Sequence, residues 1–398
     1  MAVLTELPLP PLTAAETTHG ARVAAQLAAR IEAAGGWIPF SSFMETALYA
    51  PGLGYYVVPR AVFGPGGDFV TAPELSPLFA ACVANGVAGI LAQAGGGDVV
   101  EFGAGSGALA AELMPALQRL GAPVSRYRIV EPSPALAARQ RERVAGEPKL
   151  AAWRDRFAWQ EAAPQDEWQG VAIANEVIDA LPVDRFRVTA GGCEALGVAV
   201  TGHGFGFEAR PADAELAAAV DALQGALSSP MAPGFVSEWR PGQGAWLGEA
   251  LRTLGRGAFL AFDYGLPRDQ YYHASRDGGT LCGFRRHRRV DDPLAHPGLQ
   301  DLTAWVDFSA LADNAEAAGF SLGGFATQAH YLLAAGIDAE LARLSQDADA
   351  MTLRRLRQDA ATLMLPGEMG ERFKAMALTR GIRGPLHGFG FRDLAASL

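Results

Sequence analysis

The stretch VVEFGAGSGAL, residues 99–109, joins a short apolar strand to a loop with three glycines at alternate positions. Glu101 lies near the end of the strand, and an alanine- and leucine-rich helical pattern follows the loop. Glycines at 103, 105 and 107 permit a tight turn and bring backbone N–H groups and a helix N-terminus close to a ligand. The spacing differs from the G-x-G-x-x-G of dinucleotide sites, and no P-loop lysine follows. Strand, glycine loop and helix in this order predict a ligand-binding βα unit.

Short apolar segments alternate with helical patterns on the C-terminal side of this unit. YRIVEPS (127–133), GVAIANE (170–176) and GAFLAFDYG (257–265) each predict a buried strand. Strands separated by helices indicate a parallel, doubly wound α/β sheet. FKAMALTRG (373–381) predicts a late strand that runs antiparallel beside its neighbours.

The order of these elements divides the chain into four regions. Residues 1–95 predict a helical and loop-rich N-terminal cap, with a helix at 21–34 ended by two glycines. Residues 96–190 form the predicted cofactor-binding core, and 191–250 predict an insertion of a β-hairpin plus a helix. The remainder of the core and a loop-rich, helical C-terminal region are expected in residues 251–398.

Bulk composition narrows the class of protein. The net charge of the 398 residues is −10, which argues against a general nucleic-acid binder. Three cysteines lie far apart and form no CxxC, which fits a reducing compartment. The N-terminus lacks signal-peptide features, and we expect no membrane-spanning helix because the apolar stretches are interrupted before about 18 residues. These features predict a cytoplasmic protein without membrane insertion, and no metal-ligand spacing is present.

Polar residues at the predicted strand ends indicate the ligand. Glu131 ends the second strand, where its carboxylate can accept hydrogen bonds from both hydroxyls of a ribose. Glu101 can help to hold the amino group of a methionine-like moiety. Together with the glycine loop, these acids predict S-adenosylmethionine (SAM) as the cofactor, whereas the loop alone would also fit a simple strand-to-helix turn. The predicted cofactor-binding residues are Asp68, Thr71, Glu101, Gly103, Gly105, Ser106, Gly107, Glu131, Pro132, Ser133 and Asn175.

Asn175 and Glu176 end a third strand and should face the same crevice, since ligands bind beyond the carboxyl ends of parallel strands. An amide and a carboxylate there can orient a nucleophile and offset positive charge near a methyl donor. Asn175 could instead cap a helix, and Asp179 could either take part in catalysis or act as a first-turn acid that favours the helix dipole.

Eight stretches, in order and over nearly the whole chain, resemble the MidA/NDUFAF7 family of SAM-dependent methyltransferases, found in bacteria and mitochondria. One departure is Val177 and Ile178, where the family often carries aromatic residues. The matching stretches are GDFVTAPELSPLF (67–79), VEFGAGSGALA (100–110), RIVEPSP (128–134), ANEVIDALPVDRF (174–186), SEWRPG (237–242), AFDYG (261–265), GTLCGFRRHRRVDDPLAHPGLQDLTAWVDF (279–308) and LPGEMGERFKAMALTRG (365–381).

The resemblance implies a Rossmann-like class I SAM-dependent methyltransferase fold, with a seven-stranded mostly parallel sheet, an N-terminal helical cap and an insertion. It also implies methylation of arginine in a partner protein, since mitochondrial members are linked to arginine dimethylation in a complex I subunit during assembly. The alternatives are a small-molecule methyltransferase and a SAM-binding assembly factor without turnover. The cap and the insertion could each carry a homodimer contact.

Arginine is a poor nucleophile because its guanidinium stays protonated, so carboxylates are expected to orient it. Glu176 is the first catalytic candidate, assisted by Asn175, with Asp179 and Glu238 as partners. The basic run GFRRHRR (283–289) reads either as a solvated face or as a docking site for an acidic partner surface.

Overall fold

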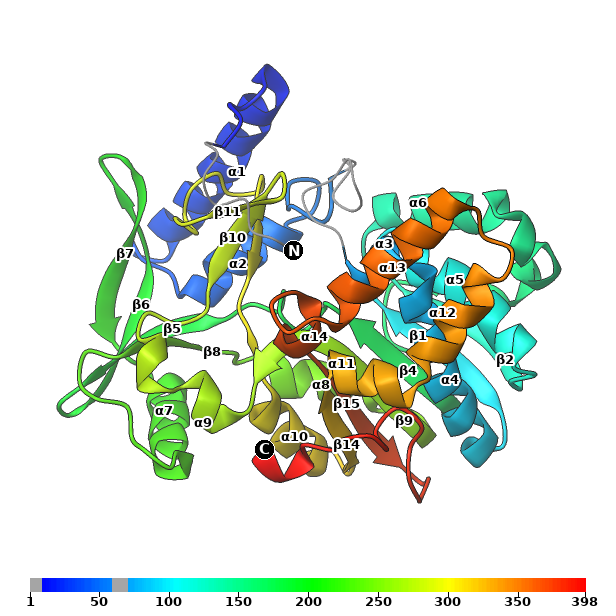
Figure 1. The fold of residues 1–398 in the computed structure, drawn as a ribbon. Helices are drawn as coiled ribbons and strands as arrows, with labels where there is room; N and C mark the ends of the chain where they lie inside the picture. Colours follow the sequence, from blue (N-terminus) through cyan, green and yellow to red (C-terminus); the bar gives the residue numbers. More distant parts are fainter. Residues whose placement is uncertain (1–8, 59–70) are drawn as a thin grey trace.

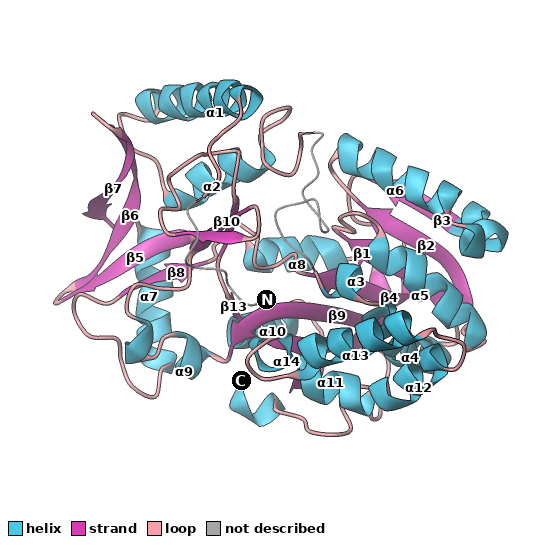
Figure 2. Ribbon diagram, turned by 45° about the horizontal axis from the view of Figure 1, so that its top comes forward, coloured by secondary structure: helices cyan, strands magenta, loops and turns pink. Residues whose placement is uncertain are grey.

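The computed structural model describes residues 9–58 and 71–398, so Asp68 lies outside the described residues. Two lobes lie side by side (Figure 1). The core lobe contains the large sheet and the helices on both of its faces. The second lobe contains the N-terminal helices, a small antiparallel sheet and a hairpin (Figure 2). Residues from both lobes line the candidate site.

The large sheet confirms the predicted architecture. Its main path has the order β14-β15-β9-β4-β1-β2-β3, and the short strand β13 pairs with β9. The neighbours from β9 to β3 pair in parallel, whereas β15 pairs antiparallel with both β9 and β14. The strands are β1 (Gly97–Phe102), β2 (Val124–Val130), β3 (Phe157–Gln160), β4 (Trp168–Asn175), β9 (Leu254–Leu266), β13 (Val306–Asp307), β14 (Ser321–Thr327) and β15 (Phe373–Arg380).

Alternate residues of the central strands supply two separate cores. In β4, Val171 and Ile173 pack in the core on one face, whereas Ala172 and Ala174 belong to the core on the other face. The first face is covered by α4 (Pro77–Ala94), α5 (Ala108–Arg119), α6 (Pro134–Gly146), α11 (Gln328–Ala334), α12 (Ile337–Ser345) and α13 (Ala350–Met364), and the second by α8 (Gln243–Leu251) and α10 (Phe308–Ala317). This burial on both faces explains why the central strands are apolar along their length.

Helix α4 departs from the expectation that every apolar stretch is too short to span a membrane. Its 18 residues, Pro77–Ala94, meet that requirement by length and composition. However, 67% of this window is buried inside the protein, as in the core helix of a globular fold. The helix contributes its apolar side chains to the core on the first face of the sheet.

The second lobe is built on a four-stranded antiparallel sheet of order β7-β6-β5-β8. A hairpin plus a helix was expected within residues 191–250, but the sheet begins earlier, and α8 from that range packs on the core lobe instead. The two N-terminal helices join this sheet, because Ile38 bridges to Val198 and Phe40 packs on Phe207 at 5.5 Å between ring centroids. The elements are α1 (Ala14–Ala33), α2 (Phe40–Tyr49), β5 (Asp184–Thr189), β6 (Gly192–Thr201), β7 (Gly204–Pro211), α7 (Ala214–Ala226) and β8 (Val236–Trp239).

The basic run forms a hairpin rather than a uniformly solvated face. Arg286 and His287 form its turn with φ of 50° and 61°. The hairpin strands are β10 and β11, and β12 pairs antiparallel with β10. The remaining short elements complete the chain: α3 (Ala72–Leu75), η1 (Pro148–Arg156), α9 (Arg268–Tyr271), η2 (Ala274–Arg276), β10 (Cys282–Arg285), β11 (Arg288–Val290), β12 (Asp301–Thr303), α14 (Met369–Arg372) and η3 (Ala395–Ser397).

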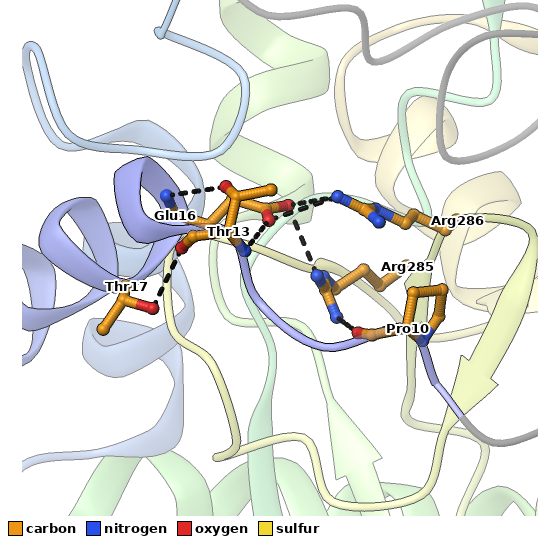
Figure 3. Close-up of polar contacts among 6 residues, drawn as sticks. All are labelled: Pro10, Thr13, Glu16, Thr17, Arg285 and Arg286. Atoms are coloured by element: carbon orange, nitrogen blue, oxygen red, sulfur yellow. Dashed lines mark hydrogen bonds and ion pairs between the residues drawn. The ribbon is translucent and has the colours of Figure 1, made fainter.

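Two arginines of this hairpin hold the start of α1 (Figure 3). Arg285 is 1% exposed and donates to Pro10 O at 2.9 Å and to the Glu16 carboxylate at 3.3 Å. Arg286 donates to the same carboxylate at 3.0 Å, while Glu16 and Thr13 form a capping box. The helix predicted at 21–34 therefore begins at Ala14, because the cap and the two arginines stabilise its first turns.

The Glu16 contacts predict a pH-dependent contribution to stability. Burial acts to raise the pKa of Glu16, but hydrogen bonds from Thr13 and the guanidinium of Arg285 lower it to about 2. A lowered folded-state pKa stabilises the protein above the unfolded value and loses this effect as pH falls toward 2. We expect Glu16→Gln to lower the urea midpoint at pH 7 and the difference from wild type to narrow toward pH 3.

The control for this experiment is Glu45→Gln, which removes an exposed ion pair with Arg30 on α1. Such exposed pairs contribute little to stability, so this variant should unfold close to wild type. A Glu16→Gln deficit that is constant across the pH range would contradict the ionic contribution.

Candidate active site

The register of the parallel strands brings their polar C-terminal residues to one line. Phe102 of β1 pairs with Val130 of β2 and with Ala174 of β4. The next residues along the three strands are therefore Gly103, Glu131 and Asn175, which all line one cavity. The sequence placed these residues at strand ends, and the register makes them neighbours.

The glycine loop uses a backbone conformation that other residues rarely adopt. Gly103, Gly105 and Gly107 have φ of 60°, 55° and 79°, all in the left-handed region. A Cβ on Gly103 would come within 3.0 Å of a methyl group of Val177. The loop is thus fitted closely against the turn after β4, and its glycines leave room for a ligand beside the backbone.

Glu131 is fixed at the edge of the cavity by two donors. Its carboxylate accepts from the Ser133 N–H and from Gln140 Nε2, both at 2.9 Å. Gln140 also donates to Gly105 O at 3.0 Å, so one buried side chain ties the glycine loop to Glu131. Burial raises the pKa of Glu131. The sequence did not identify Gln140, because a glutamine within a helix has no local pattern that marks it as buried.

Glu101 lines the same cavity from the end of β1. It is 3% exposed and accepts a hydrogen bond of 2.7 Å from the Tyr127 hydroxyl. Burial raises its pKa to about 7, although the bond from Tyr127 acts in the opposite direction. Glu101 can therefore take up either protonation state near neutral pH.

A polar cluster links α3 to the glycine loop. Ser106 Oγ donates to the Glu74 carboxylate, and Arg143 donates to Ser106 Oγ at 2.7 Å. Thr71, the residue before α3, is buried at the cavity wall. The cluster holds the short helix α3 against the loop, although only Thr71 and Ser106 of these residues were predicted from the sequence.

The cavity has a volume of about 740 Å³, within the range of small-molecule sites. It is lined by most of the predicted residues, whereas Gly107, Asp179 and Glu238 are absent from its lining. The predicted residues that line it are Thr71, Glu101, Gly103, Gly105, Ser106, Glu131, Pro132, Ser133, Asn175 and Glu176.

Glu176 occupies the most unusual backbone position of the cavity. Its φ is 53°, which costs energy for a residue with a Cβ and is often found at functional sites. Its N–H donates to Phe262 O at 2.9 Å, and Asn175 donates to its carboxylate at 3.0 Å. Burial and the neighbouring charge of Asp179 raise the pKa of Glu176 to about 8. Its charged form is thus disfavoured in the cavity, and a cation bound beside the carboxylate would favour that form.

Asp263 holds the turn that follows Glu176. Its carboxylate accepts from the N–H groups of Ile178 and Asp179 at 3.0 and 3.2 Å, and from the Tyr264 N–H at 2.9 Å. Burial, followed by repulsion from Asp179 and Glu176, raises the pKa of Asp263. Asp263 ends the apolar part of the AFDYG strand, so the strand-tip rule that marked Glu131 could also have marked this residue.

Asp179 lies behind the cavity wall rather than on it. It is 4% exposed, and burial raises its pKa to about 6 despite a hydrogen bond with Tyr264 and the nearby charge of Arg240. Its carbonyl oxygen accepts from the Ala304 N–H at 3.1 Å. This position favours a role in positioning Glu176 over contact with a ligand.

Glu238 lies away from Glu176, in the second lobe. Its carboxylate accepts from the Thr280 N–H at 2.8 Å and pairs with Arg185 at 3.5 Å. It lines a different cavity of about 450 Å³. Glu238 and Glu176 therefore do not line the same cavity.

Comparisons with known proteins agree with this geometry. A family model of S-adenosyl-L-methionine-dependent methyltransferases matches residues 82–326. A Burkholderia thailandensis structure solved with S-adenosyl-homocysteine bound is 42% identical, with a TM-score of 0.91, and the match covers 98% of this chain and 100% of that chain. A native structure from the same organism is 41% identical, with a TM-score of 0.88 and the same coverage.

Two curated relatives carry functional names. The human protein arginine methyltransferase NDUFAF7, mitochondrial, is 29% identical over 86% of this chain and 80% of its own length. The Drosophila melanogaster homologue is 28% identical over 92% of this chain and 87% of its own length. Both are named mitochondrial, and this contradicts the cytoplasmic location predicted from the sequence. The spacing of the cysteines indicates a reducing environment, and this feature does not distinguish one reducing compartment from another.

The position of Glu131 predicts a large effect on cofactor affinity. Glu131→Ala should raise the SAM dissociation constant about 10- to 100-fold. The reason is that the carboxylate would no longer accept the two hydrogen bonds expected from the ribose hydroxyls of the cofactor. Titration calorimetry measures this change. The matched control is Glu142→Ala, which changes an exposed glutamate on the following helix, α6. Equal affinity of both variants would remove Glu131 from the cofactor site.

The contacts of Asp263 predict a structural cost. Asp263→Ala leaves three backbone N–H groups without their acceptor and should lower the free energy of unfolding by about 2–4 kcal/mol. Asp263→Asn keeps one acceptor oxygen, which can serve the Ile178 and Asp179 N–H groups that share Oδ2, so it should lose less stability than Asp263→Ala. Urea unfolding of both variants distinguishes the two effects, and equal losses would show that charge rather than hydrogen bonding is essential.

Proposed function

Since the chain belongs to the family of S-adenosyl-L-methionine-dependent methyltransferases, we propose that it methylates an arginine side chain of a partner protein. Family membership confirms the predicted enzyme class and the predicted SAM cofactor. The arginine acceptor and the protein partner are proposals. They rest on the charge of the cavity and on the names of the curated relatives.

The observation that carries the proposal is the one-sided charge of the cavity. Among the described residues, its lining contains six glutamates and no lysine, arginine or histidine. Carboxylates in a partly enclosed site favour cationic occupants, because opposite charges stabilise each other strongly where water is scarce. The six are Glu74, Glu101, Glu131, Glu161, Glu176 and Glu249.

The residues present fit the cofactor. The left-handed glycines open the loop beside Val177, and Glu131 offers its carboxylate to a ribose at the end of β2. When bound, SAM supplies an electrophilic methyl group on a positively charged sulfur. The acids of the cavity lower the cost of holding that charge next to a second cation.

Glu176 is the group that we assign to the acceptor. A guanidinium presents N–H groups in a planar fork that matches a carboxylate, so Glu176 can fix one edge of the fork. This contact localises positive charge at that edge and orients the remaining nitrogen for in-line attack. Asn175 holds the carboxylate through the 3.0 Å bond from its amide, and Asp263 holds the turn behind it.

The partner protein is proposed first by its class, as a protein that carries the acceptor arginine. The relatives are named protein arginine methyltransferases, which supports a protein acceptor. The name NDUFAF7 and the family resemblance support a subunit of respiratory complex I as the partner, with methylation taking place while the complex is assembled. Two other activities are tested beside this one: methylation of a small molecule and SAM binding without turnover.

A labelling experiment separates these activities. The purified protein is incubated with tritiated SAM and a lysate of cells from which its gene is deleted. Label in protein that releases methylarginine on acid hydrolysis supports the proposal. Label only in small molecules supports the small-acceptor activity, whereas SAM binding without transfer supports an assembly factor.

Glu176→Gln is expected to abolish labelling in this assay, since the amide cannot neutralise a guanidinium. SAM affinity, measured by calorimetry, should change less than about threefold, because other residues hold the cofactor. Glu142→Gln is the exposed control and should label as wild type. Undiminished turnover of Glu176→Gln would exclude the assigned role.

The pKa of Glu176 predicts the pH dependence of the reaction. With a value of about 8 in the free protein, the carboxylate becomes protonated as pH falls, so kcat/KM should decrease below about pH 8. Asp179→Asn removes one of the acids that raise this pKa and should move the limb to lower pH. Asp301 also raises this pKa, and Asp263 is a further acid that interacts with Glu176, whereas hydrogen bonds from Asn175 and the Ala72 N–H lower the pKa. Initial rates from pH 6 to 9 measure the shift, and an unchanged limb would contradict the assignment.

A further inference from the structure

The cavity has a second wall, which comes from the second lobe. Tyr49 is the last residue of α2, and Tyr56 follows in the next turn; both line the same cavity as the strand-end residues. Ala180 and Leu181, just after Glu176 in the chain, line the cavity as well. The cofactor is assigned to residues of the core lobe, so this second wall is available for another role.

The two tyrosine rings are held in a fixed arrangement. Their centroids are 5.7 Å apart and their planes differ by 20°. The Tyr49 hydroxyl donates to Ala180 O at 2.8 Å, and the Tyr56 hydroxyl donates to the Asp301 carboxylate at 2.8 Å. Tyr55, which is fully buried, packs edge-to-face on Tyr56 at 5.0 Å. Because both hydroxyls are bound within the protein, the rings act toward the cavity as aromatic surfaces.

The wall is chemically suited to a planar cation. The face of an aromatic ring attracts a cation, and a guanidinium stacks on it because the guanidinium is flat and weakly hydrated. Its N–H edge then remains free for a carboxylate, and Glu176 lines the same cavity. A lysine ammonium would gain the ring contact without the matching fork.

We infer that Tyr49 and Tyr56 form, together with Glu176, the slot that receives the guanidinium of the acceptor arginine. This inference rests on the proposed function and adds the residues that determine acceptor specificity. The wall borders Pro51 and Gly52, which line the cavity and are exposed to solvent. An arginine of another protein can therefore extend its long side chain into the slot from the surface. The second lobe thereby supplies the acceptor side of the site.

Four variants test the slot with tritiated SAM and the gene-deleted lysate as the acceptor source. Tyr49→Leu and Tyr56→Leu remove the rings, whereas Tyr49→Phe and Tyr56→Phe keep them and remove only the hydroxyls. Each leucine variant should raise the lysate concentration for half-maximal labelling at least about fivefold. The phenylalanine variants should stay within about twofold of wild type. SAM affinity by calorimetry should remain within about twofold in all four, which also shows that each is folded.

The outcomes are distinguishable from failure of the proposed function. If the wild type labels arginine and both leucine variants keep wild-type half-saturation, the slot is refuted while the function stands. If the leucine variants weaken SAM binding to the same extent, the tyrosines belong to the cofactor site and the inference is overturned. If the wild type releases no methylarginine, both proposals fall together. The two tyrosines are changed separately, so that misfolding of one variant leaves the other as the test.

Discussion

The site depends on one constraint, which is the register that aligns the C-terminal ends of the parallel strands. Backbone hydrogen bonds between β1 and its neighbours align Phe102 with Val130 and with Ala174. Because the register is regular from Val99 to Phe102 against both neighbours, the residues beyond these strand ends cannot slide relative to one another. β9 extends the same alignment, since Asn175 pairs with Phe262 and thus brings Asp263 beside Glu176. A glycine loop and three acids meet at one edge for this reason.

The concentration of acids at this edge has an energetic consequence. Buried carboxylates are costly when they are charged, and the raised pKa values of Glu101, Glu131 and Glu176 express that cost. A cationic ligand recovers part of it, so the site is more favourable when it is filled. The strained backbone at Glu176 is maintained by the bonds of its neighbours, and Asp263 supplies two of these through the following turn. Strain and charge are thus both tolerated because the surrounding sheet is rigid.

The second lobe acts on the site through long-range contacts. α1 and α2 pack on the four-stranded sheet β7-β6-β5-β8. The hairpin of β10 and β11, which follows β9 in the chain, holds the start of α1 through Arg285 and Glu16 (Figure 3). These contacts join three segments that lie far apart in the sequence. They place Tyr49 and Tyr56 in the lining of the same cavity as the strand-end residues. Local structure around these tyrosines does not specify this position.

The amino-acid sequence by itself determined the order of strands and helices, the glycine loop and the strand-tip acids Glu101, Glu131 and Glu176. Those features follow from periodicity and turn chemistry, which are local properties of the chain. It did not determine that Gln140 and Asp263 support the loop and the turn, that Glu238 lies in another cavity, or that Arg285 is buried. Each of these depends on contacts between residues distant in the chain, whose partners no local pattern specifies. Only the tertiary structure, by fixing strand register and the packing of the two lobes, decided which polar side chains share the cavity.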